Sequence, residues 1–341
     1  MKTANIVILV VGFILIIIVL LVIAYFAYKS LFGPKPLNPP PAGGIISLSC
    51  ILPNNGNYYY YQLFDASNGD CNFQSINLTT DYNSANTSFK VLHDATDSTK
   101  FSLSTNDGHY LFLTSDSNYT DYITWSPTNA GANTNNIWFR MTAGDFDNIY
   151  LQTADGRNLG FVAINQSQSV CYEGAQVGNN KFILAVNTTS PQQFYIPAKP
   201  ASSNIPFTDN SQIVIRSGGN NLVANCASVA NARFSPAIQN NQWTVKLSSD
   251  KRAFALSFNN NYLKPSSDGS GLLYFYSTLP QLSDYDAGDF SNWFVIKNNC
   301  LVSLSTNAAL RYTTDGFLNC QNNPYYSTLG APVNNGSPIT I

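Results

Sequence analysis

The sequence predicts an all-β protein that is held on a membrane by one N-terminal helix. Two observations carry this prediction: a long apolar run from Ile6 to Tyr28, and many short strand-like segments separated by turn residues in the rest of the chain. Charged residues make up 11% of the sequence and aromatic residues 13%. A disordered chain would have few aromatic residues and a high net charge, so we expect the part after the apolar run to fold.

The apolar run contains no charged residue. As a helix rising about 1.5 Å per residue it reaches about 34 Å, enough for a hydrocarbon layer of about 30 Å. A cleaved signal peptide is the main alternative, but its apolar core is shorter and small residues follow it. This run ends in the bulky segment 24–28, AYFAY. We therefore expect a short tail at 1–5 and an uncleaved transmembrane helix at 6–28, in contact with a lipid bilayer.

The positive charges on the two sides of the run are nearly equal, because Lys2 precedes it and Lys29 and Lys35 follow it. They therefore do not decide the orientation of this single-pass protein. We favour a cytosolic N-terminus. The ectodomain would then be lumenal or extracellular, or would face a viral capsid.

Two proline-rich segments divide the remainder. The first, 29–44, is predicted to be a stalk, since its 12 proline-rich residues 33–44 would rise about 3.1 Å each as polyproline II and lift the next domain by about 35 Å. The second, 190–206, is predicted to be a linker between a first β domain at 45–189 and a second at 207–341.

Strand signals recur in both domains. Short runs rich in Thr, Tyr, Phe, Val and Ile alternate with residues that tolerate a left-handed backbone. The clearest turn clusters are Asn54-Asn55-Gly56, Asn106-Asp107-Gly108, Asp155-Gly156, Gly218-Gly219-Asn220 and Asp315-Gly316.

A weak internal repeat groups these strands into threes. Three units begin with a tryptophan and continue with two further strands, and a fourth lacks the tryptophan. They start at Trp138, Ile149 and Asn158; at Trp243, Phe254 and Tyr262; at Trp293, Leu301 and Ala309; and at Phe101 and His109. A period of about 40–50 residues is typical of β-trefoil lobes or propeller blades. A propeller would need four to eight blades without a proline-rich break, so two tandem β-trefoil-like domains are the preferred interpretation.

The turn-plus-strand segments resemble those of fascin-like and actin-crosslinking-like β-trefoils. The matching stretches are Asn106-Asp-Gly-His-Tyr-Leu, Asp155-Gly-Arg-Asn-Leu and Asn259-Asn-Asn-Tyr-Leu, within Ser47–Asn187 and Pro206–Asn323. The likeness is at the level of the fold and implies that the aromatic and leucine side chains pack into the core. The Gln-x-Trp signature of ricin-type lectins is not met by Gln242-Trp243, and the basic surface that fascin's actin binding would need is missing.

Catalytic motifs are not found in the sequence. The two histidines, His93 and His109, are expected in a loop and in an exposed turn. The acidic clusters Asp145-Phe-Asp147 and Asp284-Tyr-Asp286-Ala-Gly-Asp289 are expected to be solvated loops, with irregular Ca²⁺ binding as the alternative. We therefore expect neither enzyme activity nor a metal or cofactor.

Six cysteines show no C-x-x-C spacing, which excludes a zinc ribbon. Cys50 with Cys71 and Cys300 with Cys320 are the nearest pairs and the candidate disulfides, and buried free thiols are the alternative.

Tyrosine clusters are the candidate contact residues. They are Tyr58, Tyr59, Tyr60 and Tyr61, and Tyr325 with Tyr326. Tyrosine provides a large contact area at low entropic cost, although core packing would also explain it. Nucleic acid is excluded as a partner because no basic cluster is present.

Together these features predict a membrane-anchored, non-enzymatic structural or adhesion protein that contacts neighbouring structural proteins. The composition suggests a virion of a large DNA virus, in which the protein would link an internal membrane to the capsid. A carbohydrate-binding surface protein with glycan partners is the alternative.

Overall fold

The computed structural model describes most of the chain in separate segments. They are residues 13–24, 35–54, 57–67, 74–79, 87–106, 108–116, 119–125, 135–164, 175–177, 180–187, 189–202, 205–225, 231–235, 239–265, 273–276, 279–313, 326–331 and 337–341. The chain divides into two compact units, Met1–Pro36 and Leu37–Ile341, and each is treated by itself.

In the first unit, residues 13–24 are helical and their apolar side chains are exposed. The remaining parts of the predicted membrane span, 6–12 and 25–28, lie outside the described residues. No helix within the described segments is both long and apolar enough to cross a bilayer.

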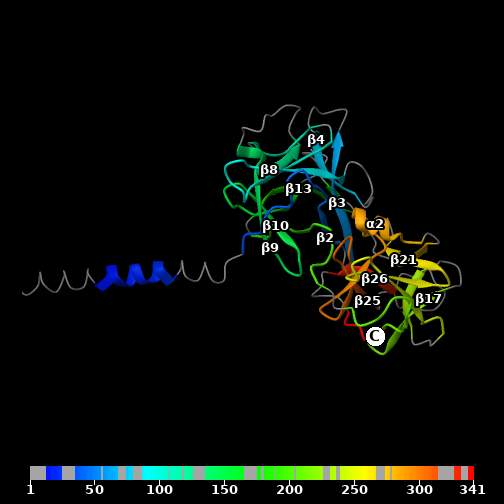
Figure 1. Ribbon diagram of the computed structural model, residues 1–341. Helices are drawn as coiled ribbons and strands as arrows, with labels where there is room; N and C mark the ends of the chain where they lie inside the picture. The colour runs from blue at the N-terminus through cyan, green and yellow to red at the C-terminus, as the bar shows by residue number, and fades with distance from the viewer. Residues whose placement is uncertain are drawn as a thin grey trace, which may run out of the picture. The chain divides into compact units, whose positions relative to one another are not determined.

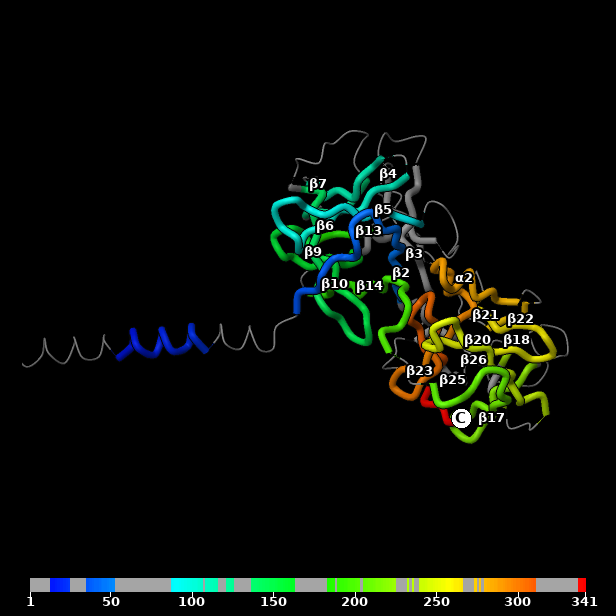
Figure 2. The backbone as a smooth tube through the Cα atoms, viewed as in Figure 1, coloured from blue at the N-terminus to red at the C-terminus, as the bar shows by residue number. Residues whose placement is uncertain are grey.

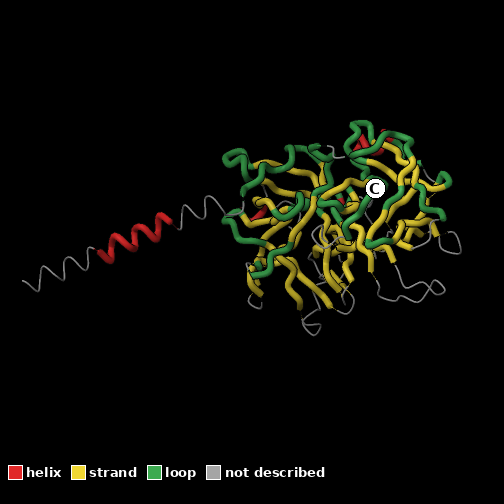
Figure 3. Tube along the Cα trace, turned by 90° about the horizontal axis from the view of Figure 1, so that it is seen from below, coloured by secondary structure: helices red, strands yellow, loops and turns green. Residues whose placement is uncertain are grey.

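The second unit consists mainly of strands joined by loops, as Figure 3 shows in yellow and green. Every strand pair within the described segments is antiparallel, and two sheets result (Figure 1). This confirms the predicted all-β class; β-trefoil symmetry remains a prediction.

The first sheet contains fourteen strands. They are β1 (Ile45–Ile46), β2 (Ser49–Asn54), β3 (Asn57–Ser67), β4 (Gln74–Thr79), β5 (Phe89–His93), β6 (Phe101–Ser104), β7 (Leu111–Asp116), β8 (Tyr119–Trp125), β9 (Phe139–Ala143), β10 (Ile149–Thr153), β11 (Leu159–Ile164), β12 (Ala175–Val177), β13 (Asn180–Val186) and β14 (Gln193–Tyr195). Their order is β1-β5-β6-β9-β10-β14-β2-β3-β4-β8-β13-β11, with β12 on β13 and β7 on β8. Residues 37–195, which carry this sheet, are called the first lobe.

The second sheet contains twelve strands. They are β15 (Gln212–Ile213), β16 (Arg216–Ser217), β17 (Asn220–Asn225), β18 (Asn231–Ser235), β19 (Trp243–Leu247), β20 (Phe254–Phe258), β21 (Asn261–Pro265), β22 (Leu273–Tyr276), β23 (Phe294–Lys297), β24 (Cys300–Ser303), β25 (Ala309–Thr313) and β26 (Tyr326–Ala331). Their order is β16-β17-β18-β22-β21-β20-β23-β24-β25-β26, with β19 on β20 and β15 on β19. Residues 205–341, which carry this sheet, are called the second lobe, and Figure 2 traces the chain through both.

The strands of the internal repeat lie where the sequence predicts them. Two of the tryptophan units become the consecutive ladders β19-β20-β21 and β23-β24-β25. The third contributes β9 and β10, which pair with each other, and β11, which pairs with β13.

Each lobe has its own apolar core. The first core includes Phe89, Trp125 and Phe194, and the second includes Trp243 and Phe254, all at most 2% exposed. The leucines that follow the turns in the repeated units are fully buried in both cores, namely Leu111, Leu159, Leu263 and Leu310. The expectation that these leucines pack into the core is confirmed.

Two-residue turns close several hairpins. Asn259-Asn260, Asn298-Asn299 and Gly218-Gly219 all have positive φ at both positions, which matches the right-handed twist of the flanking strands. Gly108 and Gly156, at φ 91° and 87°, also adopt the left-handed backbone that the sequence predicted for them. The predicted turns at Asn55-Gly56, Asp107 and Asp315-Gly316 lie outside the described residues.

Both proline-rich segments are more ordered than predicted. In the first, residues 37–44 lie against the first lobe: Leu37 N–H donates to the Met141 carbonyl at 3.0 Å, and Gly43 N–H to the Val91 carbonyl at 2.8 Å. This half of the predicted stalk is therefore part of the lobe and does not act as a spacer. In the second, Gln193–Tyr195 forms β14, which pairs with β10 and β2.

The second acidic cluster is helical, contrary to the prediction of a loop. Leu282–Ala287 forms the short helix α2, and Gly288, at φ 98°, ends it with its N–H directed at the Asp284 and Tyr285 carbonyls. Tyr285 is fully buried and packs the helix against the second lobe, and Asp286 accepts a hydrogen bond from the Ser249 hydroxyl at 2.7 Å. A helix this short has no apolar periodicity that could have predicted it.

A 3₁₀ turn, η2 (Asn135–Ile137), precedes β9.

We expect Phe254→Ala to destabilise the second lobe by about 3–5 kcal/mol, because it opens a cavity in a close-packed core. Phe254 is fully buried and meets Phe207 edge-on, with 4.9 Å between ring centroids. Urea unfolding of the full chain in mild detergent, followed by tryptophan fluorescence, measures the effect. Ile45→Ala, at a side chain that is 72% exposed, is the control and should change the free energy of unfolding by less than about 1 kcal/mol. Equal effects of the two substitutions would contradict this core assignment.

Candidate functional site

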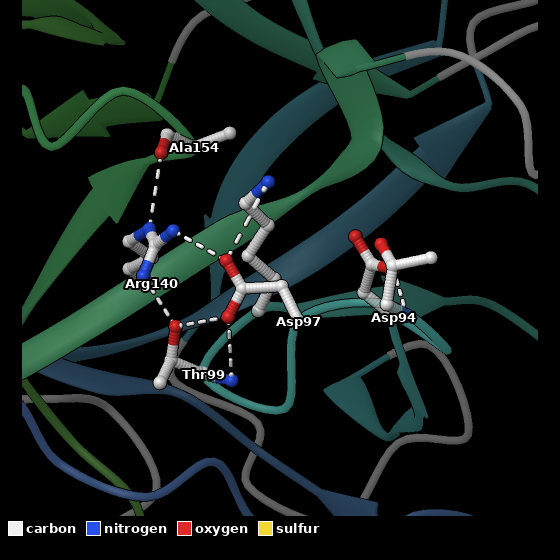
Figure 4. A network of polar contacts seen from close by, with 7 residues as sticks. Asp94, Asp97, Thr99, Arg140 and Ala154 are labelled. Carbon is white, nitrogen blue, oxygen red and sulfur yellow. Dashed lines mark hydrogen bonds and ion pairs between the residues drawn. The ribbon is translucent and has the colours of Figure 1, made fainter.

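A polar network closes the turn between β5 and β6 (Figure 4). The Asp97 carboxylate accepts hydrogen bonds from the Thr99 backbone N–H at 3.0 Å and from its hydroxyl at 2.5 Å, and Arg140 Nη2 lies 2.6 Å from Asp97 Oδ2. Arg140 also donates from Nε to the Ala154 carbonyl at 3.0 Å. These bonds tie the β5–β6 turn to β9 and to the end of β10. They give the carboxylate a scaffolding role.

A second network joins the next turns of the same lobe. Arg157 lies 2.5 Å from Asp121 and 2.8 Å from Asp155, and its backbone N–H donates to the Thr153 hydroxyl at 3.1 Å. Hydrogen bonds from Ser115 and Arg157 lower the pKa of Asp121, and a hydrogen bond from Thr153 lowers that of Asp155. Both carboxylates are therefore held in the charged form.

The second lobe uses the same turn chemistry. The Ser248 hydroxyl accepts from Arg252 N–H at 3.1 Å and Ala253 N–H at 2.9 Å, and donates to Asp250 at 2.8 Å. Asp250 also accepts from the Tyr285 hydroxyl at 3.0 Å. Burial raises the pKa of Tyr285 to about 12, so this phenol stays protonated and can donate. The bond ties α2 to the turn that carries Arg252.

The first acidic cluster lies where the two lobes meet. Asn307, 1% exposed, donates from Nδ2 to the Phe146 carbonyl at 2.7 Å and to Asn148 Oδ1 at 3.0 Å. Its Oδ1 accepts from Lys297 Nζ at 2.7 Å, and Lys297 in turn lies 2.8 Å from Asp147. The prediction of a solvated loop is confirmed, because Asp145, Phe146 and Asp147 are exposed and lie in the loop 144–148. The loop also docks on the second lobe through these contacts.

A cavity of about 370 Å³ adjoins this contact. It is called the junction cavity and is lined by Asp147 and Tyr195 of the first lobe, by the connecting segment 198–202, and by parts of the second lobe. The second-lobe residues are Ile205, Arg252, Val295, Ile296, Lys297 and Leu304. Its size lies in the range of about 300–1,000 Å³ that is usual for small-ligand pockets.

The lining of the junction cavity is basic. Lys199, Arg252 and Lys297 face a single carboxylate, Asp147. Lys199 Nζ also lies 2.7 Å from Asp286 on α2 and 5.0 Å from the centre of the Tyr285 ring. Lys297 Nζ lies 5.5 Å from the centre of the Tyr195 ring. Such a site can bind an anion through charge-assisted hydrogen bonds.

The predicted contact tyrosines lie on two strands. Tyr58, Tyr59, Tyr60 and Tyr61 belong to β3, opposite Pro53, Leu52, Ile51 and Cys50 of β2, and Tyr326 begins β26. Backbones of β3 and β26 approach to within 8 Å between Cα atoms. Tyr325 and all of these side chains lie outside what the structure describes, so their contact role stays a prediction.

Cys50 and Cys300 are buried, and neither forms a disulfide with another described residue. Burial raises the pKa of both, which makes them poor nucleophiles at neutral pH. Their predicted partners, Cys71 and Cys320, lie outside the described residues, so the two pairings stay predictions.

Both histidine predictions were wrong. His109 is only 9% exposed, and its backbone N–H donates to the Thr105 hydroxyl at 3.0 Å while its carbonyl accepts from the Thr105 N–H. His93 ends β5 and its Nε2 lies 2.7 Å from the Pro40 carbonyl. His93 thereby holds residues 37–44, which were predicted to be part of the stalk, against the rest of the first lobe.

Sequence reasoning missed the cations of the junction cavity. Lys199, Arg252 and Lys297 are far apart along the chain and belong to no motif. The connecting segment offered one weak signal, a lysine between two prolines at 197–200, which the linker interpretation did not use.

Comparisons with known proteins give no family for the chain. No family model matches it, and no curated protein matches it significantly. Among solved structures it is similar to one described as "Structure and mode of action of a mosquitocidal holotoxin", at 11% sequence identity and a TM-score of 0.41. The match covers 89% of this chain and 35% of the other, so this chain spans about a third of that protein's length.

Asn307→Gly tests the contact between the lobes. Glycine tolerates the positive φ of this residue, 55°, so the substitution removes the side chain without straining the backbone. We expect a loss of about 1–3 kcal/mol in the free energy of unfolding, because buried partners lose their hydrogen bonds, and faster amide hydrogen exchange in the loop 144–148. Asn260→Gly, in an exposed hairpin turn at φ 61°, is the matched control and should leave that loop unchanged. Unchanged exchange in Asn307→Gly would show that the side chain does not hold the loop.

Asp97→Asn tests the turn network by its pH dependence. Hydrogen bonds from Thr99, aided by Arg140, lower the pKa of Asp97 to about 2, below the ordinary value of about 3.9. The carboxylate therefore contributes stability that is fully present above about pH 4 and lost as the pH falls towards 2. Urea midpoints of wild type and Asp97→Asn should differ at pH 5 and converge near pH 2. A constant difference over this range would refute the assignment, and Asp284→Asn on the exposed face of α2 is the control.

Proposed function

We propose that this protein is a membrane-anchored, non-enzymatic structural or adhesion protein. The apolar run 6–28 is its single-pass anchor, and the two lobes are β-trefoil-like heads that dock on neighbouring structural proteins. The virion of a large DNA virus, where an internal membrane faces a capsid, is the setting that we propose for it.

The observation that carries the anchor is the exposed apolar helix at 13–24. Its side chains from Phe13 to Ile23 are 42–65% exposed. A continuous apolar surface of this kind marks a membrane or protein contact. Charged residues are missing from the whole run 6–28, and lipid is the environment in which such a helix has no unsatisfied backbone group.

The structural role of the polar residues supports a non-enzymatic head. Asp97, Asp155 and Asp250 cap turns, and Asp121 of β8 bonds Ser115 of β7 and Arg157. Asp147 joins the lobes. These groups hold the fold in place and their pKa values, where shifted, are lowered, whereas a general acid would need a raised one.

The repeated strand triplets support the trefoil-like arrangement. Three tryptophan-headed units recur with the same strand order along the chain, and the buried leucine of each third strand lies in the core of its lobe. Such recurrence is expected when each lobe is built from copies of one supersecondary unit.

Carbonate extraction tests the anchor. The full chain, translated in the presence of microsomes, should stay in the membrane pellet at alkaline pH. Leu15→Lys with Ile18→Lys should release it, since each lysine near the centre of a span costs about 2.5–3.5 kcal/mol. Ile45→Lys in β1 is the control and should leave the chain in the pellet. Release of the wild-type chain would refute the anchor, and protease protection in the same samples gives the orientation.

Purified particles test the role of the heads. A fixed stoichiometry in a virion or envelope lattice, with crosslinks from β3 or β26 to a neighbouring protein, supports the structural role. Saturable binding on a glycan array without such crosslinks would instead favour the carbohydrate-binding alternative.

A further inference from the structure

We propose that the junction cavity binds a small organic anion, an apolar or aromatic body that carries one carboxylate. This inference rests on the cavity alone and does not depend on the membrane anchor or on the adhesion role.

The first argument is the balance of charge. The whole chain has a net charge of −2 and only 11% charged residues, yet three cations and one carboxylate line this one cavity. Lys297 is already engaged, because it pairs with Asp147 and donates to Asn307. Lys199 is likewise paired, with Asp286 at 2.7 Å, so the surplus positive charge rests on Arg252.

The second argument is the geometry of Arg252. One of its guanidinium N–H groups donates from Nη1 to the Pro200 carbonyl at 3.1 Å, which holds the side chain against the connecting segment. A guanidinium carries five N–H donors in a planar fork. A carboxylate matches two parallel donors of that fork, a geometry that lysine does not offer. Lys199 also lines the cavity, with its ammonium group paired to Asp286.

The third argument is the apolar part of the lining. Val295 and Leu304 are 5% and 2% exposed, and Ile205 and Ile296 are half-buried. The Tyr195 ring adds an aromatic wall. An apolar body would be covered by these side chains, while the presence of Asp147 disfavours a ligand with several negative charges. The ligand is therefore a monoanion with an apolar group.

The test is a ¹⁹F NMR titration of the full chain in neutral detergent with 4-(trifluoromethyl)phenylacetate. We expect saturable binding, and the corresponding neutral amide and inorganic phosphate should each bind at least about tenfold more weakly. Detergent alone is titrated in parallel, which separates partitioning into micelles from binding to the protein.

Variants locate the site. Arg252→Gln should weaken binding about tenfold, and Arg252→Lys should have an intermediate effect because charge remains but the fork is lost. Lys251→Gln removes the same charge one residue away, at a side chain that does not line the cavity, and should change affinity less than about twofold. Ala201→Trp, which fills the cavity from the connecting segment, should abolish binding without altering charge.

Three results would overturn the proposal. They are the failure of the acid to saturate, equal binding of the acid and its amide, and unchanged binding in both Arg252→Gln and Ala201→Trp. Near-ultraviolet circular dichroism shows whether each variant is folded. If Arg252→Gln does not fold, Ala201→Trp still tests the site.

Discussion

The fold depends on tight hairpin turns that require a left-handed backbone. Antiparallel strands are short here, so the chain must reverse often, and each reversal needs residues that accept positive φ without strain. Among the described non-glycine residues, seven of the ten with positive φ are asparagines. At these positions the choice of asparagine is explained by backbone conformation.

Polar side chains stabilise these turns through hydrogen bonds to the turn backbone. Ser248 and Thr153 accept the backbone N–H four residues ahead, and an aspartate two residues ahead bonds the same hydroxyl. Arg140 and Arg157 then connect neighbouring turns to strands. With few charges in the chain, most of the described carboxylates are used in this way. A polar framework of this kind specifies one turn geometry, because each bond is lost if the turn changes.

The junction between the lobes also uses an asparagine with positive φ and polar side-chain contacts, and these contacts border a cavity. Asn307 adopts positive φ, as the turn asparagines do, but its carboxamide reaches the loop 144–148 of the other lobe. Lys297 is held beside it, and the connecting segment brings Lys199 to the same place. A cavity with a basic lining results from residues that each have a structural task. The proposed ligand site thus arises from the docking of the two lobes, and neither lobe forms it alone.

The sequence by itself determined the all-β class, the strands of the tryptophan units, the leucines of the cores and the turns at Gly108, Gly156 and Gly218-Gly219. These features follow from local rules, because strand alternation and backbone tolerance depend on neighbours in the chain. The helix α2, the burial of His109 and the docking of segment 37–44 required the tertiary structure, since each depends on partners far along the chain. The junction cavity is the extreme case: Lys199, Arg252 and Lys297 carry no shared motif, and only the packing of two lobes and their connecting segment decides that their charges meet.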